Sequence, residues 1–154
     1  MSVTELTYYA GRLNLMPTQP DLAQKTELFR AALTAAVTLH RTRFEWTFLN
    51  ISEIVVMERR FFSGFLVKFK PESQAEIARL DTRTLQVAIA RDLVESKARF
   101  FVEVETGLVF YHPAPPEIPI KVFESRFSKL FETGLGNFFI SAQIDPIKEE
   151  FSIL

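Results

Sequence analysis

The chain contains no cysteine, one tryptophan and only two histidines among its 154 residues. Without cysteine, disulfides and thiolate metal sites are excluded, and nothing points to an oxidising compartment. The two histidines, His40 and His112, are far apart in the sequence. We therefore expect each of them to serve in packing or capping, and we predict neither a metal site nor a cofactor.

Long apolar runs and an excess of one charge are also lacking. No apolar run approaches the length of about 18 residues that a membrane-spanning helix requires, so no span is expected. The N-terminal residues lack a basic region followed by an apolar stretch, so we expect no signal peptide and predict a cytoplasmic protein. The net charge of −1 argues against a positive electrostatic field over the whole molecule that would attract nucleic acid. A local basic strip is still compatible with this net charge.

Phenylalanine is abundant, with 16 residues in a chain that is 47% hydrophobic. A phenylalanine buries a large apolar area and has no polar atom to satisfy, so we assign most of these residues to a core. An exposed patch that binds a partner is the alternative. The length predicts a single domain over residues 1–154, or the N-terminal domain of a longer protein.

Period-two alternation predicts most of the strands. It is clearest between Met57 and Pro71, where one face is apolar and the other is basic at both ends. Pro71 has no N–H to donate, so we expect this strand to end there. The same alternation, with a turn at residues 105–107, predicts further strands over residues 3–16, 44–56, 85–93, 98–112 and 138–144.

Apolar residues three and four apart predict two helices. The first covers residues 20–39, with Thr18 as its N-cap, and ends beside His40, where a cation would suit the helix dipole. The second covers residues 119–132 and is followed by Gly134 at a typical position for a residue that ends a helix.

Three segments are ambiguous. Residues 85–93 alternate like a strand, which we favour, but Leu85, Ile89 and Leu93 also fit one face of a helix. Residues 72–80 have an irregular pattern that favours a short helix or an irregular link. Residues 145–150 resemble the start of a helix, and the apolar Phe151, Ile153 and Leu154 follow. These last residues either pack on the domain or dock on a partner, and the second alternative includes a chain that is a fragment.

The order of elements predicts an α+β fold, with a mainly antiparallel sheet and two helices packed on one face. If residues 72–94 are set aside, the rest resembles a ferredoxin-like β-α-β-β-α-β core with an inserted hairpin. The RNA-recognition fold has the same order of elements, so we compared its third-strand signature with residues 62–69. Only Val67 and Phe69 match.

A basic strip is the main candidate for nucleic-acid binding. Its cations would contact phosphates, and a neighbouring aromatic ring would stack on a base. The candidate residues are Arg59, Arg60, Phe62, Lys68 and Lys70. An ordinary solvated sheet face, with lysines that guard an edge, is the alternative.

Carboxylates occur in two patterns that could support catalysis. Asp81 followed by Glu95 and Lys97 resembles the spacing in restriction-endonuclease-like nucleases, in which carboxylates hold a metal ion and the lysine helps to activate water. Glu103 and Glu105 would share one face of a strand. Such spacings arise often by chance in a chain with 24% charged residues.

No catalytic constellation stands out, so we predict a protein that is not an enzyme. The first hypothesis is a protein-interaction or assembly module that is part of a larger complex or a longer chain. It would bind a protein partner or itself, through an exposed strand or through Phe151, Ile153 and Leu154. Nucleic-acid binding through residues 59–70 is the second hypothesis, and a metal-dependent nuclease or hydrolase is the third.

Overall fold

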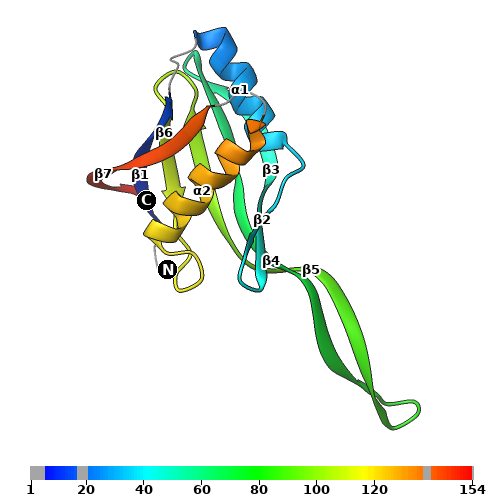
Figure 1. Ribbon diagram of the computed structural model, residues 1–154. Coiled ribbons are helices and arrows are strands. Elements are labelled where there is room, and N and C mark those ends of the chain that lie inside the picture. The colour runs from blue at the N-terminus through cyan, green and yellow to red at the C-terminus, as the bar shows by residue number, and fades with distance from the viewer. Residues whose placement is uncertain (1–5, 17–20, 137–139, 154) are drawn as a thin grey trace.

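The structure is a computed structural model that describes residues 6–16, 21–136 and 140–153 (Figure 1). The elements of this part of the chain are, in order, β1 (Leu6–Met16), α1 (Leu22–Thr34), β2 (Leu39–Arg41), β3 (Phe44–Val56), β4 (Arg59–Arg79), β5 (Thr84–Glu103), β6 (Leu108–His112), α2 (Ile120–Gly134) and β7 (Ser141–Ile153).

The strands form one antiparallel sheet in the order β2-β3-β4-β5-β6-β1-β7. The α+β class and the antiparallel sheet are therefore confirmed. The ferredoxin-like core is wrong, because β2, β3, β4, β5 and β6, which lie between the two helices in the sequence, form a five-stranded antiparallel meander. Residues 72–94, which were set aside from that core, extend two of the central strands of the sheet.

Both helices cover the same face of the sheet (Figure 1). The Phe29 ring of α1 lies 6.5 Å from that of Phe62, and the Phe127 ring of α2 lies 5.0 Å from that of Phe100. Phe62 and Phe100 share this face because Gly64, two residues after Phe62, is paired with Phe100. This contact face is the hydrophobic core.

Helix α1 begins one residue after Asp21, whose side chain accepts a hydrogen bond from the Gln24 amide at 2.8 Å. The expected N-cap, Thr18, lies outside the described residues. The helix ends at Thr34 and not near Leu39, so the expectation that His40 ends it is wrong. The backbone becomes extended at Ala35. His40 lies in the short strand β2, which pairs with β3.

Helix α2 confirms the prediction for residues 119–132. Its buried residues Phe123, Phe127, Leu130 and Phe131 follow the spacing of one helical face. Gly134 ends the helix where it contacts α1. A Cβ atom at this position would lie 2.6 Å from the Ala32 carbonyl oxygen, so only glycine allows the two helices to approach this closely.

The tail does not form the helix expected from residue 145. Residues 141–153 form β7, which pairs with β1 from Ser141 opposite Met16 to Ile153 opposite Leu6, with a register shift between Tyr9 and Ala10. Pro146 is tolerated because β7 is an edge strand. On the outer side of an edge strand no neighbouring strand requires a backbone N–H donor. The backbone of Phe151 is paired with Tyr8 and that of Ile153 with Leu6, whereas Leu154 lies outside the described residues.

Candidate functional site

A long hairpin projects from the sheet at one end of β4 and β5 (Figure 1). These strands have 21 and 20 residues, about twice the usual upper length of a strand in a globular protein. We call residues 71–94 the arm. Residues 72–80 were expected to form a helix or an irregular link, and this is wrong, because 72–79 are part of β4. The expectation that the strand ends at Pro71 is wrong for the same reason. The strand predicted over 85–93 is confirmed.

The two strands of the arm pair only with each other among the described strands. β3 pairs with β4 no farther than Phe69, and β6 pairs with β5 only at residues 99–102. Within the arm the ladder runs from Glu72 opposite Arg91 to Arg79 opposite Thr84. Both outer edges of the arm therefore present backbone groups without a neighbouring strand.

Local contacts shape the tip of the arm. Arg83 has a positive φ of 59° in the turn that joins the two strands. Behind the turn, the Arg79 guanidinium donates a hydrogen bond to the Gln86 side chain at 2.6 Å. The Thr82 and Thr84 hydroxyls lie 2.7 Å apart. These contacts stay within the hairpin, so the arm gains its order from its own residues.

Large apolar side chains on the arm are exposed to solvent, with exposed fractions of 36–74%. They are Ile77, Leu80, Leu85, Val87, Ile89, Leu93 and Val94. The remaining exposed large apolar residues of the described chain are Met16, Leu22, Leu49, Val55, Val56 and Met57. More than half of this exposed apolar surface thus belongs to one short segment, which distinguishes the arm from the scattered single residues of an ordinary surface.

The arm has two unlike faces. Leu85, Val87 and Ile89 share one face by alternation, opposite Ala78, Glu76 and Gln74 of β4. The other face is built mainly from small residues, and Ala75 is paired there with Ala88. The apolar stripe therefore follows β5 rather than β4.

The predicted basic strip is divided by the fold. Arg59 donates a hydrogen bond to Glu103 at 2.7 Å, and Arg60 donates one to Glu53 at 2.7 Å. Neighbouring residues on a strand point to opposite faces, so these two arginines do not share a surface. Phe62 is 1% exposed and packs in the core, so its ring is not available for base stacking.

Lys68 and Lys70 lie about 26 Å and about 33 Å from Arg60 along β4, since a strand rises about 3.3 Å per residue. The Lys68 ammonium is 4.1 Å from the centroid of the Phe44 ring, and that of Lys70 is 5.7 Å from it. Lys70 also lies 4.0 Å from a carboxylate oxygen of Glu95. These two lysines and Phe44 form a small basic cluster at the base of the arm.

The residues of the predicted nuclease motif are far apart. Asp81 lies in the turn at the tip of the arm, whereas Glu95 and Lys97 lie at its base. The intervening length of β5 is about 35 Å at the usual rise per residue. Nowhere in the described ranges do three His, Cys, Asp or Glu side chains gather closely enough to hold a metal ion.

The other polar candidates also have structural partners. Glu103 is 4% exposed and bound to Arg59, while Glu105 is exposed in the turn after β5, so the two carboxylates do not share a strand face as expected. His40 lies 3.2 Å from Glu45, and the His112 ring nitrogen lies 2.8 Å from the Thr7 carbonyl oxygen.

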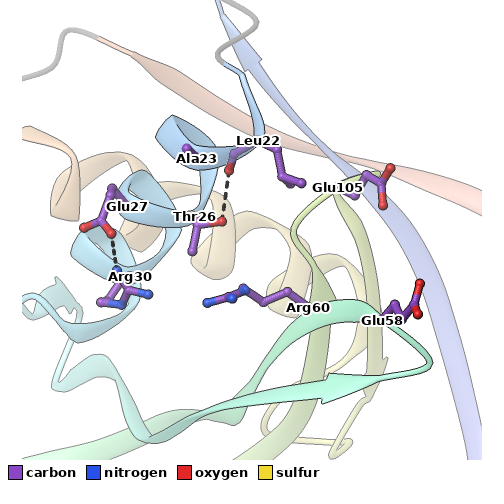
Figure 2. Close-up of a pocket in the computed structure, with 8 residues that line it drawn as sticks. All are labelled: Leu22, Ala23, Thr26, Glu27, Arg30, Glu58, Arg60 and Glu105. Carbon is purple, nitrogen blue, oxygen red and sulfur yellow. Dashed lines mark hydrogen bonds and ion pairs between the residues drawn. The ribbon is translucent and has the colours of Figure 1, made fainter.

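A polar groove of about 590 Å³ lies beside the start of α1 (Figure 2). Arg30 and Arg60 extend into it from α1 and β4, and both donate hydrogen bonds to Glu53 at 2.7 Å. These bonds, the one from Arg30 above all, lower the pKa of Glu53. The lining residues Glu27, Glu58 and Glu105 add further negative charge. With its arginines already bound to carboxylates, the groove has no cation left to bind an anion.

One partly buried polar pair joins α2 to the sheet. The Tyr111 hydroxyl donates a hydrogen bond to Glu124 at 3.1 Å, and the Tyr111 ring stacks on Phe123 at 4.1 Å. Burial raises the pKa of Glu124 and that of Tyr111. The pair anchors α2, and the residues around it suggest no reaction.

The sequence pattern contained a signal for the arm that our interpretation missed. The alternation of Leu85, Val87 and Ile89 is repeated more weakly by Ala75 and Ile77 before the polar turn at residues 81–83. Two such runs about a short polar turn are typical of a hairpin.

Comparisons with protein-family models, with curated proteins and with solved structures found no match for this chain. Within the described residues, no helix is both long and apolar enough to cross a membrane. Function must therefore be argued from the surfaces described above.

Proposed function

We propose that the protein is a non-enzymatic interaction or assembly module, and that the arm is its contact element. The observation that carries this proposal is the concentration of exposed apolar side chains on residues 71–94. A contiguous apolar surface of this kind marks an interaction site in soluble proteins. It also brings an aggregation risk to a protein that never covers it.

The length of the arm supports the same conclusion. An isolated two-stranded hairpin is only marginally stable in water, and none of the other described strands and helices packs on residues 72–91 as a third strand or a covering helix. A partner that covers the apolar face would supply the burial that the arm lacks. The arm also holds its contact surface at a distance from the body. Partners of very different shapes can therefore reach this surface.

The decisive experiment replaces residues 71–92 with Asn-Gly, a turn suited to a two-residue hairpin loop. We expect the shortened chain to fold, because the deleted residues pair only with each other. We also expect it to lose association with itself, measured by sedimentation equilibrium, or with another protein, measured by co-purification against the intact chain. If both measurements give the same result for the intact and shortened chains, the proposal fails.

One observation supports nucleic-acid binding as a second candidate. Lys68 and Lys70 lie beside the Phe44 ring, and this combination of cations and an aromatic surface suits a single strand. Substitution of both lysines by glutamate tests this function. Binding to single-stranded RNA or DNA that is steeply salt-dependent and lost in this variant would support it. Binding that is absent or insensitive to salt would refute it.

A further inference from the structure

Cations gather where β2, β3 and β4 meet α2, at the end of the sheet from which the arm projects (Figure 1). Arg41 is paired with Phe44 across β2 and β3, and Lys68 is paired with Trp46 across β3 and β4. Lys70 is two residues after Lys68 and therefore shares its face of the strand. Helix α2 contributes one further cation. The four residues, which we call the cationic site, are Arg41, Lys68, Lys70 and Arg126.

Two aromatic rings position these cations. The Lys68 ammonium lies 4.1 Å from the centroid of the Phe44 ring and 5.8 Å from that of Trp46. The Arg126 guanidinium lies 5.4 Å from the Trp46 centroid, and the Lys70 ammonium lies 5.7 Å from the Phe44 centroid. Contacts between a cation and a ring are attractive at these distances. Trp46 is 3% exposed, so Lys68 and Arg126 are held against a fixed part of the core.

Ion pairs leave most of the cationic site unneutralised. Among the described residues, no carboxylate lies within ion-pair distance of Arg41, Lys68 or Arg126. Lys70 has one such neighbour, a Glu95 oxygen at 4.0 Å. The site therefore differs from the groove beside α1, in which both arginines are bound to carboxylates.

The hydrogen-bond donors of the two arginines are also only partly used. The Nε atom of Arg126 is buried and has no hydrogen-bond partner among the described residues. Its Nη1 atom donates to the Ser125 hydroxyl at 3.4 Å, and Arg41 donates to the His40 carbonyl oxygen at 2.8 Å. Burial, and to a lesser extent the charge of Arg41, lower the pKa of Arg126. A bound anion would satisfy the free donors and reduce the repulsion between the arginines.

The acidic residues around the site have partners of their own. Arg41 also lines a groove of about 360 Å³ with Lys129, Glu124 and Glu132. Glu124 accepts a hydrogen bond from a tyrosine hydroxyl of β6, and Glu132 accepts one from a backbone amide of β7. Glu45 lies 3.2 Å from a histidine of β2. None of these three carboxylates forms an ion pair with the cationic site, which is therefore open to an external anion.

We propose that the cationic site binds the phosphate groups of a ligand, either a small phosphorylated molecule or a nucleic-acid strand. Four cations on β2, β4 and α2 suit an anion with more than one charge, and a phosphate group carries up to about two. The planar guanidinium of an arginine can bind two phosphate oxygens at once. The inference goes beyond the proposed function, because the site lies outside the arm. For a nucleic-acid strand, it adds Arg41 and Arg126 to the residues of the second candidate function.

Trp46 provides a reporter within the site, because it is the only tryptophan in the chain. The intact protein is titrated at low salt with sodium tripolyphosphate and, separately, with single-stranded oligothymidylate, while tryptophan emission is recorded. We expect a saturable change with at least one of these probes, and weaker binding at higher salt, because salt screens exposed charges. Sodium chloride at matched ionic strength should give no saturable change.

The site variant is the double substitution Arg41→Gln and Lys68→Gln, and the matched control is Lys97→Gln with Arg99→Gln. The cations of the control lie 4.8 and 5.5 Å from the Phe65 ring, but on the opposite face of the sheet. We expect the dissociation constant to rise about tenfold or more in the site variant. It should change less than about twofold in the control. Urea unfolding of each variant checks the fold.

Arg126→Gln should weaken binding in the same way. Because Arg126 also packs on Trp46, the double variant on β2 and β4 keeps the test independent of that packing. If the substitutions weaken binding of the oligonucleotide, the phosphates belong to a nucleic-acid strand. If they weaken binding of tripolyphosphate alone, the ligand is a small phosphorylated molecule.

Three results would overturn the inference. In the first, neither probe gives a saturable change. In the second, the control on the opposite face weakens binding as much as the site variant does. In the third, the oligonucleotide binds through Lys68 and Lys70 alone, so that Arg41→Gln and Arg126→Gln have no effect, and only the second candidate function survives. The proposed function of the arm is independent of all three, because association is measured separately.

Discussion

Replacement of the apolar stripe by Leu85→Thr, Val87→Thr and Ile89→Thr should weaken self-association without unfolding the protein. Threonine keeps the β-branched shape that suits a strand, so the hairpin itself should persist. The three native side chains are 58–74% exposed, so their removal creates no cavity. Substitutions at such positions usually change the free energy of unfolding by no more than about 0.5 kcal/mol each.

The expected loss of affinity follows from the same exposures. Full burial of a valine, leucine or isoleucine contributes about 1.5–3 kcal/mol, and more than half of that gain is still available to each residue of the stripe. If two copies associate through their arms, six such side chains take part, and we assume that each is covered only in part. If threonine removes roughly 0.5 kcal/mol per position, the dimer loses about 3 kcal/mol, a dissociation constant raised on the order of 100-fold.

Sedimentation equilibrium measures this change, and urea unfolding monitored by circular dichroism checks the fold. The matched control substitutes Leu49, Val55 and Val56 by threonine, since these residues are 46–65% exposed but lie outside the arm. The reasoning is refuted if the control weakens association as much as the stripe variant does. It is also refuted if the stripe variant associates as strongly as the native chain.

Three further predictions concern the body of the protein. Phe127→Ala should lower the free energy of unfolding by about 3–5 kcal/mol in urea titrations, because this fully buried ring contacts several others. Gly134→Ala should cost about 1–3 kcal/mol by the same assay, because its Cβ would clash with the backbone of α1, whereas Gly136→Ala meets nothing within 4 Å. Glu53→Gln should make stability less dependent on pH in acid. The pKa of Glu53 is lowered in the folded state by Arg30, so its contribution is present above the unfolded pKa and is lost as the pH falls through the folded one.

Each of these predictions has an outcome that contradicts it. A loss below about 1 kcal/mol in Phe127→Ala would mean that the core is not close-packed around this ring. Equal stability of the two glycine variants would contradict the close approach of α1 and α2. An unchanged acid limb in Glu53→Gln would show that the ion pairs of Glu53 contribute nothing in solution.

Local pattern was enough to predict most elements of the body, although not β2 or the strand that the tail forms. The apolar spacing of Phe123, Phe127 and Phe131 is a property of one helix, and it identified both the helix and its buried face. The alternation between Phe61 and Phe69 likewise identified a strand. In each case the periodicity of the side chains and the geometry of the backbone coincide, so neighbours in sequence are sufficient.

The candidate site was harder to predict, because pairing between distant residues defines it. Arg59, Arg60 and Phe62 looked like exposed binding residues, but Glu103, Glu53 and the helices engage them in the fold. No spacing in the sequence reveals such partners. The arm was also misread in part, since a short run with Ala75, Ile77 and Leu80 is compatible with either a helix or a strand.

By itself, the sequence determined an α+β protein with two amphipathic helices, a phenylalanine-rich core and no thiol chemistry. These properties depend on composition and on contacts between residues a few positions apart. Only the tertiary structure decided the strand order, the pairing of the tail with β1 and the projection of residues 71–94 from the body. Whether an apolar strand is covered depends on which elements lie next to it, and that arrangement is set by packing over the whole chain.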